Sequence, residues 1–333
     1  MMSPVFGFFL PLLATVLLTA GGTRLLYPYL TKKKCGQTIL MIGPRWHKNK
    51  EGTPTMGGIV FLVVTLTAGC VLSVVITRNT EPKERYSLLS VLFFAVGNAL
   101  IGFVDDMAKF RKKQNEGLRP GQKIVLQTLV GGIFLFFMTR FSDNGTIIRI
   151  PFTTFSYDVG VFYYAVSLFL ILGIVNCTNL SDGVDGLCAS TSAVTGFFFA
   201  FAAYFLEKNS LLALSVIIVG TAVGFLFYNA HPARIFMGDT GSLFFGAMIA
   251  GGAFLIGNPL ILLPLALVPE IEGISDVLQV MFYKLTHKRI FRMAPLHHHF
   301  EASGFSENSI VLLFSVISLV GALLGSFDLW LAR

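Results

Sequence analysis

Long apolar runs separated by short polar loops dominate this chain of 333 residues. A bilayer core is crossed by about 20 mostly apolar helical residues, so each run of this length predicts one transmembrane helix. The sequence therefore predicts an all-α, polytopic integral membrane protein with about ten spans. The expected spans lie at 4–27, 57–77, 87–104, 123–139, 159–177, 188–206, 210–228, 242–257, 260–284 and 308–331.

The composition agrees with a membrane protein. Hydrophobic residues make up 54% of the chain and charged residues only 13%, whereas charged residues are about a quarter of a soluble domain. The formal net charge of +7 comes from basic residues that cluster between the spans, where they set orientation, so no nucleic-acid partner is expected. The sequence shows no repeat, low-complexity tract or long linker, and residues 1–333 are expected to form a single catalytic domain.

The basic residues also predict the topology. If the loops after spans one, three, five, seven and nine are cytoplasmic, these loops together with the adjacent span ends hold 18 of the 25 Lys and Arg, and the positive-inside rule places both termini outside. The other seven are Arg78, Lys83, Arg85, Arg140, Arg149, Lys208 and Arg333. On the external side, segment 140–158 contains an Asp-Asn-Gly turn signal before a β-prone stretch, which is typical of a short β-hairpin.

Five polar stretches beside the apolar runs then fall on the cytoplasmic face. They lie at 102–106, 176–186, 229–239, 270–276 and 294–299, and they carry acidic, amide or histidine side chains. Ionisable groups at membrane depth are costly unless they line a polar cavity, so by default they mark function. The sequence therefore predicts an active-site cleft on the cytoplasmic face.

The third expected span ends in Asp105 and Asp106, and a basic loop follows. Adjacent helical residues point about 100° apart, so the pair cannot hold one partner side by side. One carboxylate could lie near a metal ion or a phosphate, and the other could hold or deprotonate a reacting group. The alternative is a helix end that is neutralised by its own basic loop.

Residues 176–186 carry a polar side chain at every third position, namely Asn176, Asn179, Asp182 and Asp185. This spacing drifts by about 60° per step around a helix, so the four cannot share one narrow stripe. Two glycines in the stretch offer a helix break, and a helix end with carboxylates could bind a polar ring by hydrogen bonds. The alternative is a helix end capped by its own Asn and Asp side chains.

Asp239 follows a Gly-containing turn before the eighth expected span. Mg²⁺ usually takes one or two protein carboxylates together with water and phosphate oxygens, so Asp239 is a candidate magnesium ligand. It could instead be the N-cap of that span.

The last cytoplasmic loop carries three consecutive histidines at 297–299, which cannot all face one zinc ion. Phosphate or sugar oxygens are better ligands for them, and a solvated polar loop is the alternative.

Carboxylates for Mg²⁺, basic side chains for phosphate oxygens and an apolar wall open to lipid together favour phosphoryl transfer between a water-soluble and a lipid substrate. A transporter would tend to carry its charges near the bilayer midplane on broken, repeated helices. Here the charges lie at one face, and the sequence shows no repeat.

Five segments, in order and spacing over nearly the whole chain, resemble the phospho-N-acetylmuramoyl-pentapeptide transferase family. They are Lys-Glu-Gly-Thr-Pro-Thr-Met-Gly-Gly at 50–58, Phe-Val-Asp-Asp at 103–106, the stretch 176–186, Phe-Met-Gly-Asp at 236–239 and Ala-Pro-Leu-His-His-His-Phe-Glu at 294–301. The Asp-Asp pair and the Asn-Asp stretch are shared across the polyprenyl-phosphate N-acetylhexosamine-1-phosphate transferase superfamily. The first and last segments point to the muramoyl-pentapeptide branch. One departure is Val184, where the pattern often has Leu.

The resemblance implies transfer of phospho-N-acetylmuramoyl-pentapeptide from its UDP carrier to undecaprenyl phosphate. The products would be lipid I and UMP, and the cofactor would be Mg²⁺. The reaction would be the first membrane step of peptidoglycan synthesis. It also implies a multi-pass protein of the bacterial plasma membrane, a homodimer, and inhibition by uridine-containing nucleosides. The alternatives are a polyprenyl-phosphate N-acetylglucosamine-1-phosphate transferase and a non-catalytic transporter of lipids or nucleotide sugars.

Carried over by motif, the resemblance also implies roles for individual residues. Asp105, Asp106, Asp239 and His297 would be catalytic, with Asp239 holding Mg²⁺ and Asp105 or Asp106 deprotonating or positioning the lipid phosphate. Uracil would stack on Phe236 near Gly183, Val184 and Asp185. The remaining substrate-binding candidates are Lys50, Thr55, Lys109, Lys123, Asn176, Asn179, Asp182, Gln279 and His298.

Overall fold

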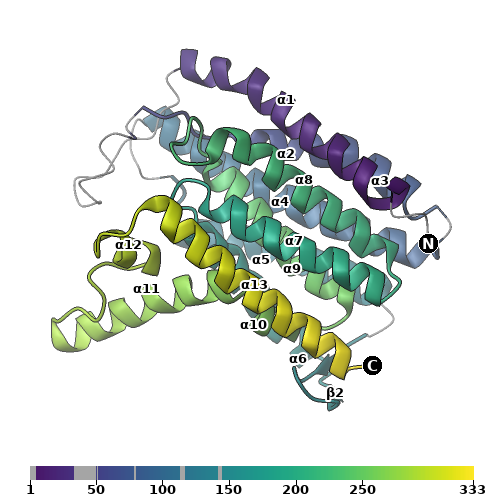
Figure 1. The fold of residues 1–333 in the computed structure, drawn as a ribbon. Coiled ribbons are helices and arrows are strands. Elements are labelled where there is room, and N and C mark those ends of the chain that lie inside the picture. Colours follow the sequence, from purple (N-terminus) through teal and green to yellow (C-terminus); the bar gives the residue numbers. More distant parts are fainter. Residues whose placement is uncertain (1–4, 34–49, 51, 79, 113–116, 142–144) are drawn as a thin grey trace.

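The computed structural model describes residues 5–33, 50, 52–78, 80–112, 117–141 and 145–333. They form a bundle of helices with one small hairpin (Figure 1), which confirms the predicted all-α membrane fold. The elements are η1 (Val5–Phe9), α1 (Leu10–Lys32), α2 (Ile59–Val64), η3 (Thr65–Gly69), α3 (Cys70–Val75), α4 (Pro82–Lys112), α5 (Pro120–Phe141), β1 (Ile147–Arg149), β2 (Ser156–Asp158), α6 (Phe162–Leu180), α7 (Leu187–Phe205), α8 (Asn209–Asn229), α9 (Gly238–Ile256), η4 (Pro259–Ile261), α10 (Leu262–Leu265), α11 (Leu267–Thr286), α12 (Leu296–Glu301) and α13 (Glu307–Leu331).

Eight of the described helices are long and apolar enough to cross a membrane, namely α1, α4, α5, α6, α7, α8, α9 and α13. The second expected span is a shorter apolar helix over Ile59–Val75, with one π-helical turn in its middle. The ninth expected span, 260–284, is not one continuous helix, because the chain breaks at Ala266 between α10 and α11. Pro269 explains the break, since it has no N–H for the carbonyl of Leu265 and its ring clashes with that carbonyl.

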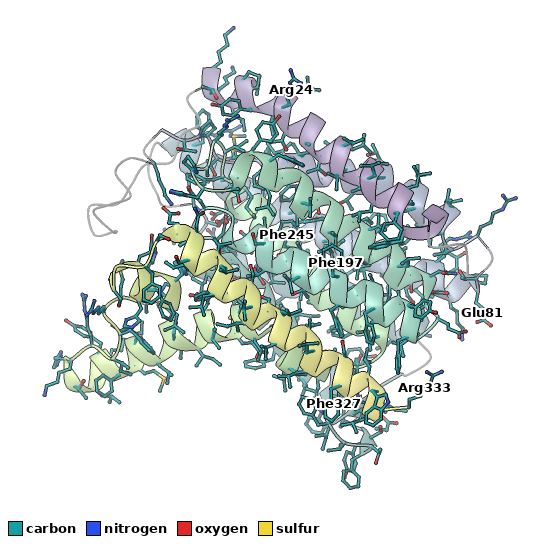
Figure 2. All side chains as sticks on the ribbon, in the orientation of Figure 1. Arg24, Glu81, Phe197, Phe245, Phe327 and Arg333 are labelled. Atoms are coloured by element: carbon teal, nitrogen blue, oxygen red, sulfur yellow. The ribbon has the colours of Figure 1, made fainter. Side chains whose placement is uncertain are left out.

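Helix α9 forms the centre of the bundle, and 94% of its most apolar window is buried. It is rich in small residues, including Gly246, Ala250 and Gly251, which allow neighbouring helices to approach closely in a membrane. At Gly251 a side chain would meet Val91 of α4 at 2.3 Å. Phe245 points into the bundle whereas Phe197 lies on its outside (Figure 2), so apolar surface is both packed inside and offered to lipid.

The two ends of the bundle differ. The chain termini and the β1–β2 hairpin lie at one end, and α12 lies at the other (Figure 1). Glu81 and Arg333 share the end of the termini (Figure 2). The hairpin is antiparallel, with Ile148 opposite Tyr157, so the predicted external hairpin is confirmed as a structure. Both termini at one end is the arrangement that an even number of crossings requires.

The orientation in the membrane can be tested with two cysteines at opposite ends, in a background where the four native cysteines are replaced by alanine. Tyr157→Cys lies on the exposed hairpin, and Lys288→Cys lies on the exposed segment after α11. Membrane-impermeant maleimide should label Tyr157→Cys in intact spheroplasts and Lys288→Cys only after lysis, because basic loops stay cytoplasmic. The reverse labelling pattern would overturn the orientation.

Candidate active site

The carboxylate of Asp106, near the end of α4, caps the start of α9. It accepts hydrogen bonds from the backbone N–H of Asp239 at 3.1 Å, from the backbone N–H of Thr240 at 3.0 Å and from the Thr240 hydroxyl at 2.6 Å. The first amides of a helix have no partner within the helix and carry partial positive charge, so a carboxylate is well placed there. The helices meet because α4 has Gly102 at the contact, where a side chain would lie 2.2 Å from the Asp239 carbonyl oxygen.

The side chain of Asp239 is free for another role because Asp106 provides the cap. One Asp239 oxygen contacts the ammonium groups of Lys123 at 2.8 Å and Lys109 at 3.2 Å. The other oxygen accepts from the Asn179 amide at 3.1 Å. Asn179 also donates to Ser242 at 2.7 Å and accepts from Lys123 at 3.2 Å. The geometry thus favours a ligand-binding role for Asp239 over the helix-cap alternative.

Asp105 completes an acidic cluster with Asp106 and Asp239. Its carboxylate contacts the Lys109 ammonium at 2.6 Å and accepts from the backbone N–H of Leu118 at 2.7 Å. Oxygens of the three carboxylates lie within 4.8 Å of one another. Hard divalent cations such as Mg²⁺ prefer carboxylate oxygens, so the donor set fits such an ion. The two lysines balance part of the negative charge.

The segment around Thr55 pairs with the turn that leads into α9. The Phe236 N–H donates to the Pro54 carbonyl at 2.8 Å, and the Phe236 carbonyl accepts from the Gly57 N–H at 2.9 Å. The turn needs Gly238, which has a φ of +69° and where a side chain would collide with Asp106 and Thr55. This pairing brings Thr55 and the half-buried Phe236 to the edge of the acidic cluster.

A second charged cluster joins three loops on the same end of the bundle. The Lys50 ammonium contacts Asp185 and Glu307, each at 2.7 Å. The His231 ring lies 3.1 Å from Asp185, which also accepts from the Ala233 N–H at 2.9 Å. Burial alone would lower the pKa of Lys50, but the hydrogen bonds and charges of the two carboxylates raise it above its usual value.

Asp182 lies between the two clusters. Removal from water, followed by the negative charges of Asp239, Asp106 and Asp185, raises the pKa of Asp182 well above its usual range. A carboxyl group with a raised pKa can donate a hydrogen bond as well as accept one.

His297 forms a buried pair with Glu272 of α11. The Nδ1 atom of His297 lies 3.0 Å from the Glu272 carboxylate, which also accepts from the His297 backbone N–H at 3.2 Å. Both side chains are at most 1% exposed. The Nε2 atom has no partner among the described residues and points at Gly183, where a side chain would lie only 2.1 Å away. The missing side chain at Gly183 therefore makes room for the imidazole.

The remaining candidates lie around these clusters. Asn176 bonds to Gln127 of α5 at 2.8 Å, and His298 contacts Glu301 within α12 at 2.6 Å. The Gln279 amide is used to hold the loop at Ile290 and Phe291. Val184 is buried in a small apolar cluster with Leu187, Val268, Ile310 and Phe314.

The sequence reasoning missed four partners in the site. Glu272 was noted only as one of a group of acids, and its pairing with His297 depends on how α11 and α12 pack. Glu307 resembles an ordinary acidic residue in the first turn of a helix. Neither His231 nor Thr240 was assigned a role. The sequence shows the Asn229–His231 stretch as a polar interruption, but it does not show that His231 points toward Asp185.

The fold and the site geometry define a membrane-embedded transferase, and comparison with known proteins agrees. Residues 88–257 match Glycosyl transferase family 4, and residues 50–62 match Phospho-N-acetylmuramoyl-pentapeptide-transferase signature 1. Three curated relatives carry the name phospho-N-acetylmuramoyl-pentapeptide-transferase. The protein of Carboxydothermus hydrogenoformans is 41% identical over 96% of this chain and 97% of its own length. The protein of Heliobacterium modesticaldum is 43% identical over 90% of this chain and 91% of its own length. The protein of Geobacillus thermodenitrificans is 40% identical over 95% of this chain and 96% of its own length. The chain belongs to the phospho-N-acetylmuramoyl-pentapeptide-transferase family.

The Glu272–His297 pair leads to a prediction for turnover. Glu272→Ala leaves a buried imidazole without its partner, which should lower the free energy of unfolding by about 1–3 kcal/mol. The His297 ring is then no longer held in place, so kcat should fall as well. Glu272→Gln keeps an oxygen acceptor and should retain more turnover than Glu272→Ala. Steady-state kinetics on purified protein would measure both.

Glu270→Gln is the matched control for Glu272→Gln, because Glu270 lies on the same helix and its side chain makes no hydrogen bond to the described residues. Equal losses in the Glu270 and Glu272 variants would mean that Glu272 does not position His297.

Proposed function

We propose that the protein transfers phospho-N-acetylmuramoyl-pentapeptide from UDP-N-acetylmuramoyl-pentapeptide to undecaprenyl phosphate, giving lipid I and UMP. The observation that carries the proposal is the acidic cluster of Asp105, Asp106 and Asp239 at the helix ends of a membrane bundle, where Lys109 bridges Asp105 and Asp239 and Lys123 contacts Asp239. Both substrates are phosphate esters, and one is water-soluble while the other is a lipid. A polar site at the boundary of the bilayer can receive both.

Cationic side chains bind the diphosphate in this proposal. Lys109 and Lys123 both contact Asp239, and Lys50 contacts Asp185. These ammonium groups can turn from carboxylates to the phosphate oxygens of an incoming substrate, which carry stronger negative charge. Asp239, with Asp105 beside it, would hold Mg²⁺, which supplies charge stabilisation to a transferring phosphoryl group.

Asp105 and Asp106 have different roles in this proposal. Asp106 positions Asp239 through the backbone at the start of α9, and Asp105 orients Lys109 toward the lipid phosphate. An oxygen of the lipid phosphate attacks the phosphorus that carries the sugar. The bond from that phosphorus to the oxygen of UMP breaks, and UMP leaves with the bonding electrons.

The nucleoside occupies the loops around Phe236 and Asp185. Phe236 is half-buried and offers a ring face for the uracil base, while the backbone at Gly183 packs against the imidazole of His297. The Nε2 atom of His297 then hydrogen-bonds a diphosphate or sugar oxygen of the substrate. Nucleoside inhibitors that contain uridine would bind in the same place. The protein lies in the bacterial plasma membrane, and we propose a homodimer.

The substrate assignment is tested by UMP release in detergent with undecaprenyl phosphate as acceptor. UDP-N-acetylmuramoyl-pentapeptide should support release, and UDP-N-acetylglucosamine should not. Preference for UDP-N-acetylglucosamine would identify the sister transferase, and release from neither donor by a folded protein that still binds them would indicate a transporter.

The metal role of Asp239 predicts a large effect for a small change. Asp239→Asn keeps the shape and removes one charge, so turnover should fall by at least about a hundredfold, since metal stabilisation of phosphoryl charge is worth several kcal/mol. Asp158→Asn, on the external hairpin, makes the same chemical change away from the site and should keep full activity. Wild-type turnover in the Asp239 variant would leave it without a metal role.

The base-stacking role of Phe236 predicts a selective loss of nucleotide binding. Stacking is worth about 1–3 kcal/mol, so Phe236→Ala should weaken binding of the UDP substrate roughly ten- to hundredfold. Binding of undecaprenyl phosphate, which has no base, should be unchanged. Phe227→Ala is the control, because Phe227 is exposed on α8. Calorimetry with each substrate measures the effect, and a variant that lost only lipid binding would move Phe236 to the lipid groove.

A further inference from the structure

Gln127 of α5 and Asn176 of α6 form a pair of amide side chains between two of the membrane-spanning helices. The Asn176 amide nitrogen donates to the Gln127 oxygen at 2.8 Å, and the Gln127 nitrogen donates to the Asn176 oxygen at 3.4 Å. The Asn176 nitrogen also donates to the Leu172 carbonyl at 2.8 Å. A side-chain amide has two N–H donors, so Asn176 uses both of them within the protein and has none left for a substrate.

The amide pair supports a part of α5 that has few other contacts. Within residues 120–126 every residue except Lys123 is exposed, and Gln127, at 1% exposure, is the first buried residue of the helix. The next buried position, Gly131, lies against apolar side chains of α6. A polar pair in an otherwise apolar helix contact fixes the register of the two helices. Gln127 therefore fixes the end of α5 that carries Lys123.

Lys123 and Asn179 form a second polar contact between the same two helices, one turn closer to the acidic cluster. Residues three or four apart on a helix are neighbours, so Lys123 lies beside Gln127 and Asn179 lies beside Asn176. Lys123 donates to Asn179 at 3.2 Å and contacts Asp239 at 2.8 Å. The amide pair thus lies directly behind the lysine that reaches the acidic cluster.

We infer that the Gln127–Asn176 pair positions Lys123 so that its ammonium group can bind the diphosphate of a nucleotide. A lysine has a compact charge on a flexible four-carbon stem, so the place that its ammonium group reaches depends on where its helix is held. Neither amide contacts the substrate, and both act through Lys123. The inference rests on the part of the proposed function in which Lys123 binds the diphosphate, and it does not depend on which sugar is transferred.

Calorimetry on the full-length protein in detergent with Mg²⁺ tests the inference, with UDP and uridine as ligands. Gln127→Met keeps the length of the side chain and removes the amide. UDP binding should weaken about three- to tenfold, because the charge-assisted contact of Lys123 with phosphate is partly lost. Uridine has no phosphate, so its binding should be unchanged and would show that the variant is folded. Equal weakening for both ligands would indicate a general disturbance of the site and would overturn the inference.

Changing the other partner tests whether the two amides act as one unit. Asn176→Leu should weaken UDP binding as much as Gln127→Met does. The double variant should bind UDP no more weakly than either single variant, because each change breaks the same contact. Losses that add would mean that the two residues act separately, which would overturn the pair as the positioning element.

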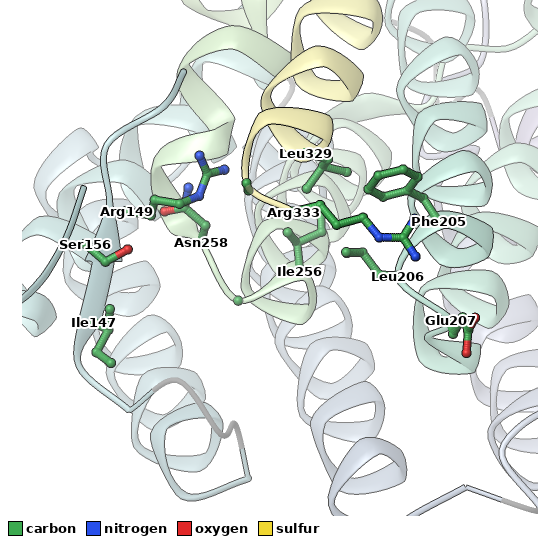
Figure 3. A pocket seen from close by; sticks show the side chains of 12 residues that line it. Ile147, Arg149, Ser156, Phe205, Leu206, Glu207, Ile256, Asn258, Leu329 and Arg333 are labelled. Carbon is green, nitrogen blue, oxygen red and sulfur yellow. The ribbon is translucent and has the colours of Figure 1, made fainter. Parts of the chain in front are cut away.

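Each of these variants has a matched control. Gln122→Met makes the same change on the exposed side of α5, where the Gln122 side chain accepts from the backbone N–H of Arg119. Asn258→Leu removes a buried amide beside the cavity at the opposite end of the bundle (Figure 3). Both controls should bind UDP like wild type. Losses equal to those of the Gln127 and Asn176 variants would overturn the positioning role.

A cycle with Lys123→Met tests whether the pair acts through the lysine. Lys123→Met alone should weaken UDP binding at least about tenfold, since a charge-assisted hydrogen bond is lost. Gln127→Met should then have no further effect, because no ammonium group remains to be positioned. Additive losses would overturn the inference alone. Wild-type protein that binds neither UDP nor uridine would instead contradict the proposed function, and the inference with it.

Discussion

The candidate site depends on one contact between helices, the carboxylate of Asp106 at the amino end of α9. In a bundle surrounded by lipid, the first amides of a helix must find partners within the protein. Asp106 supplies them from α4, and Gly102 allows the two backbones to approach closely enough. This contact fixes the first turn of α9 and thereby directs Asp239 toward Lys109 and Lys123.

Part of the negative charge in the site is balanced by lysine contacts that a substrate can replace. Each of the three carboxylates of the acidic cluster already accepts hydrogen bonds, and Lys109 bridges Asp105 and Asp239. Buried charges are stable only when paired in this way. In the proposed function, an incoming diphosphate would offer the lysines an alternative anion, so the contacts that stabilise the site without substrate would also prepare it for a phosphate ester.

The sequence could predict the features that depend on the residues of a single segment. Apolar runs predicted eight of the spans, the β-prone segment 140–158 predicted the hairpin, and the polar stretches pointed to Asp105, Asp106 and Asp239, whose carboxylates the structure brings together. Contacts between helices could not be predicted, because spacing along one helix does not reveal which helix lies opposite. The cap on α9, the pairing of Glu272 with His297 and the contact of Lys50 with Glu307 are all of this kind. The break at Ala266 was missed although Pro269 could have indicated it.

If Asp106 acts by holding the start of α9, its effect should depend on Thr240, and a double-mutant cycle of the two residues measures that dependence. Asp106→Asn and Thr240→Val each remove part of the contact at 2.6 Å between the carboxylate and the hydroxyl. Residues in direct contact show coupling energies of about 0.5–3 kcal/mol. The measurement is the thermal stability and turnover of both single variants and the double variant. The double variant should lose clearly less than the sum of the single losses, in stability and in turnover alike. Simple additivity would contradict it.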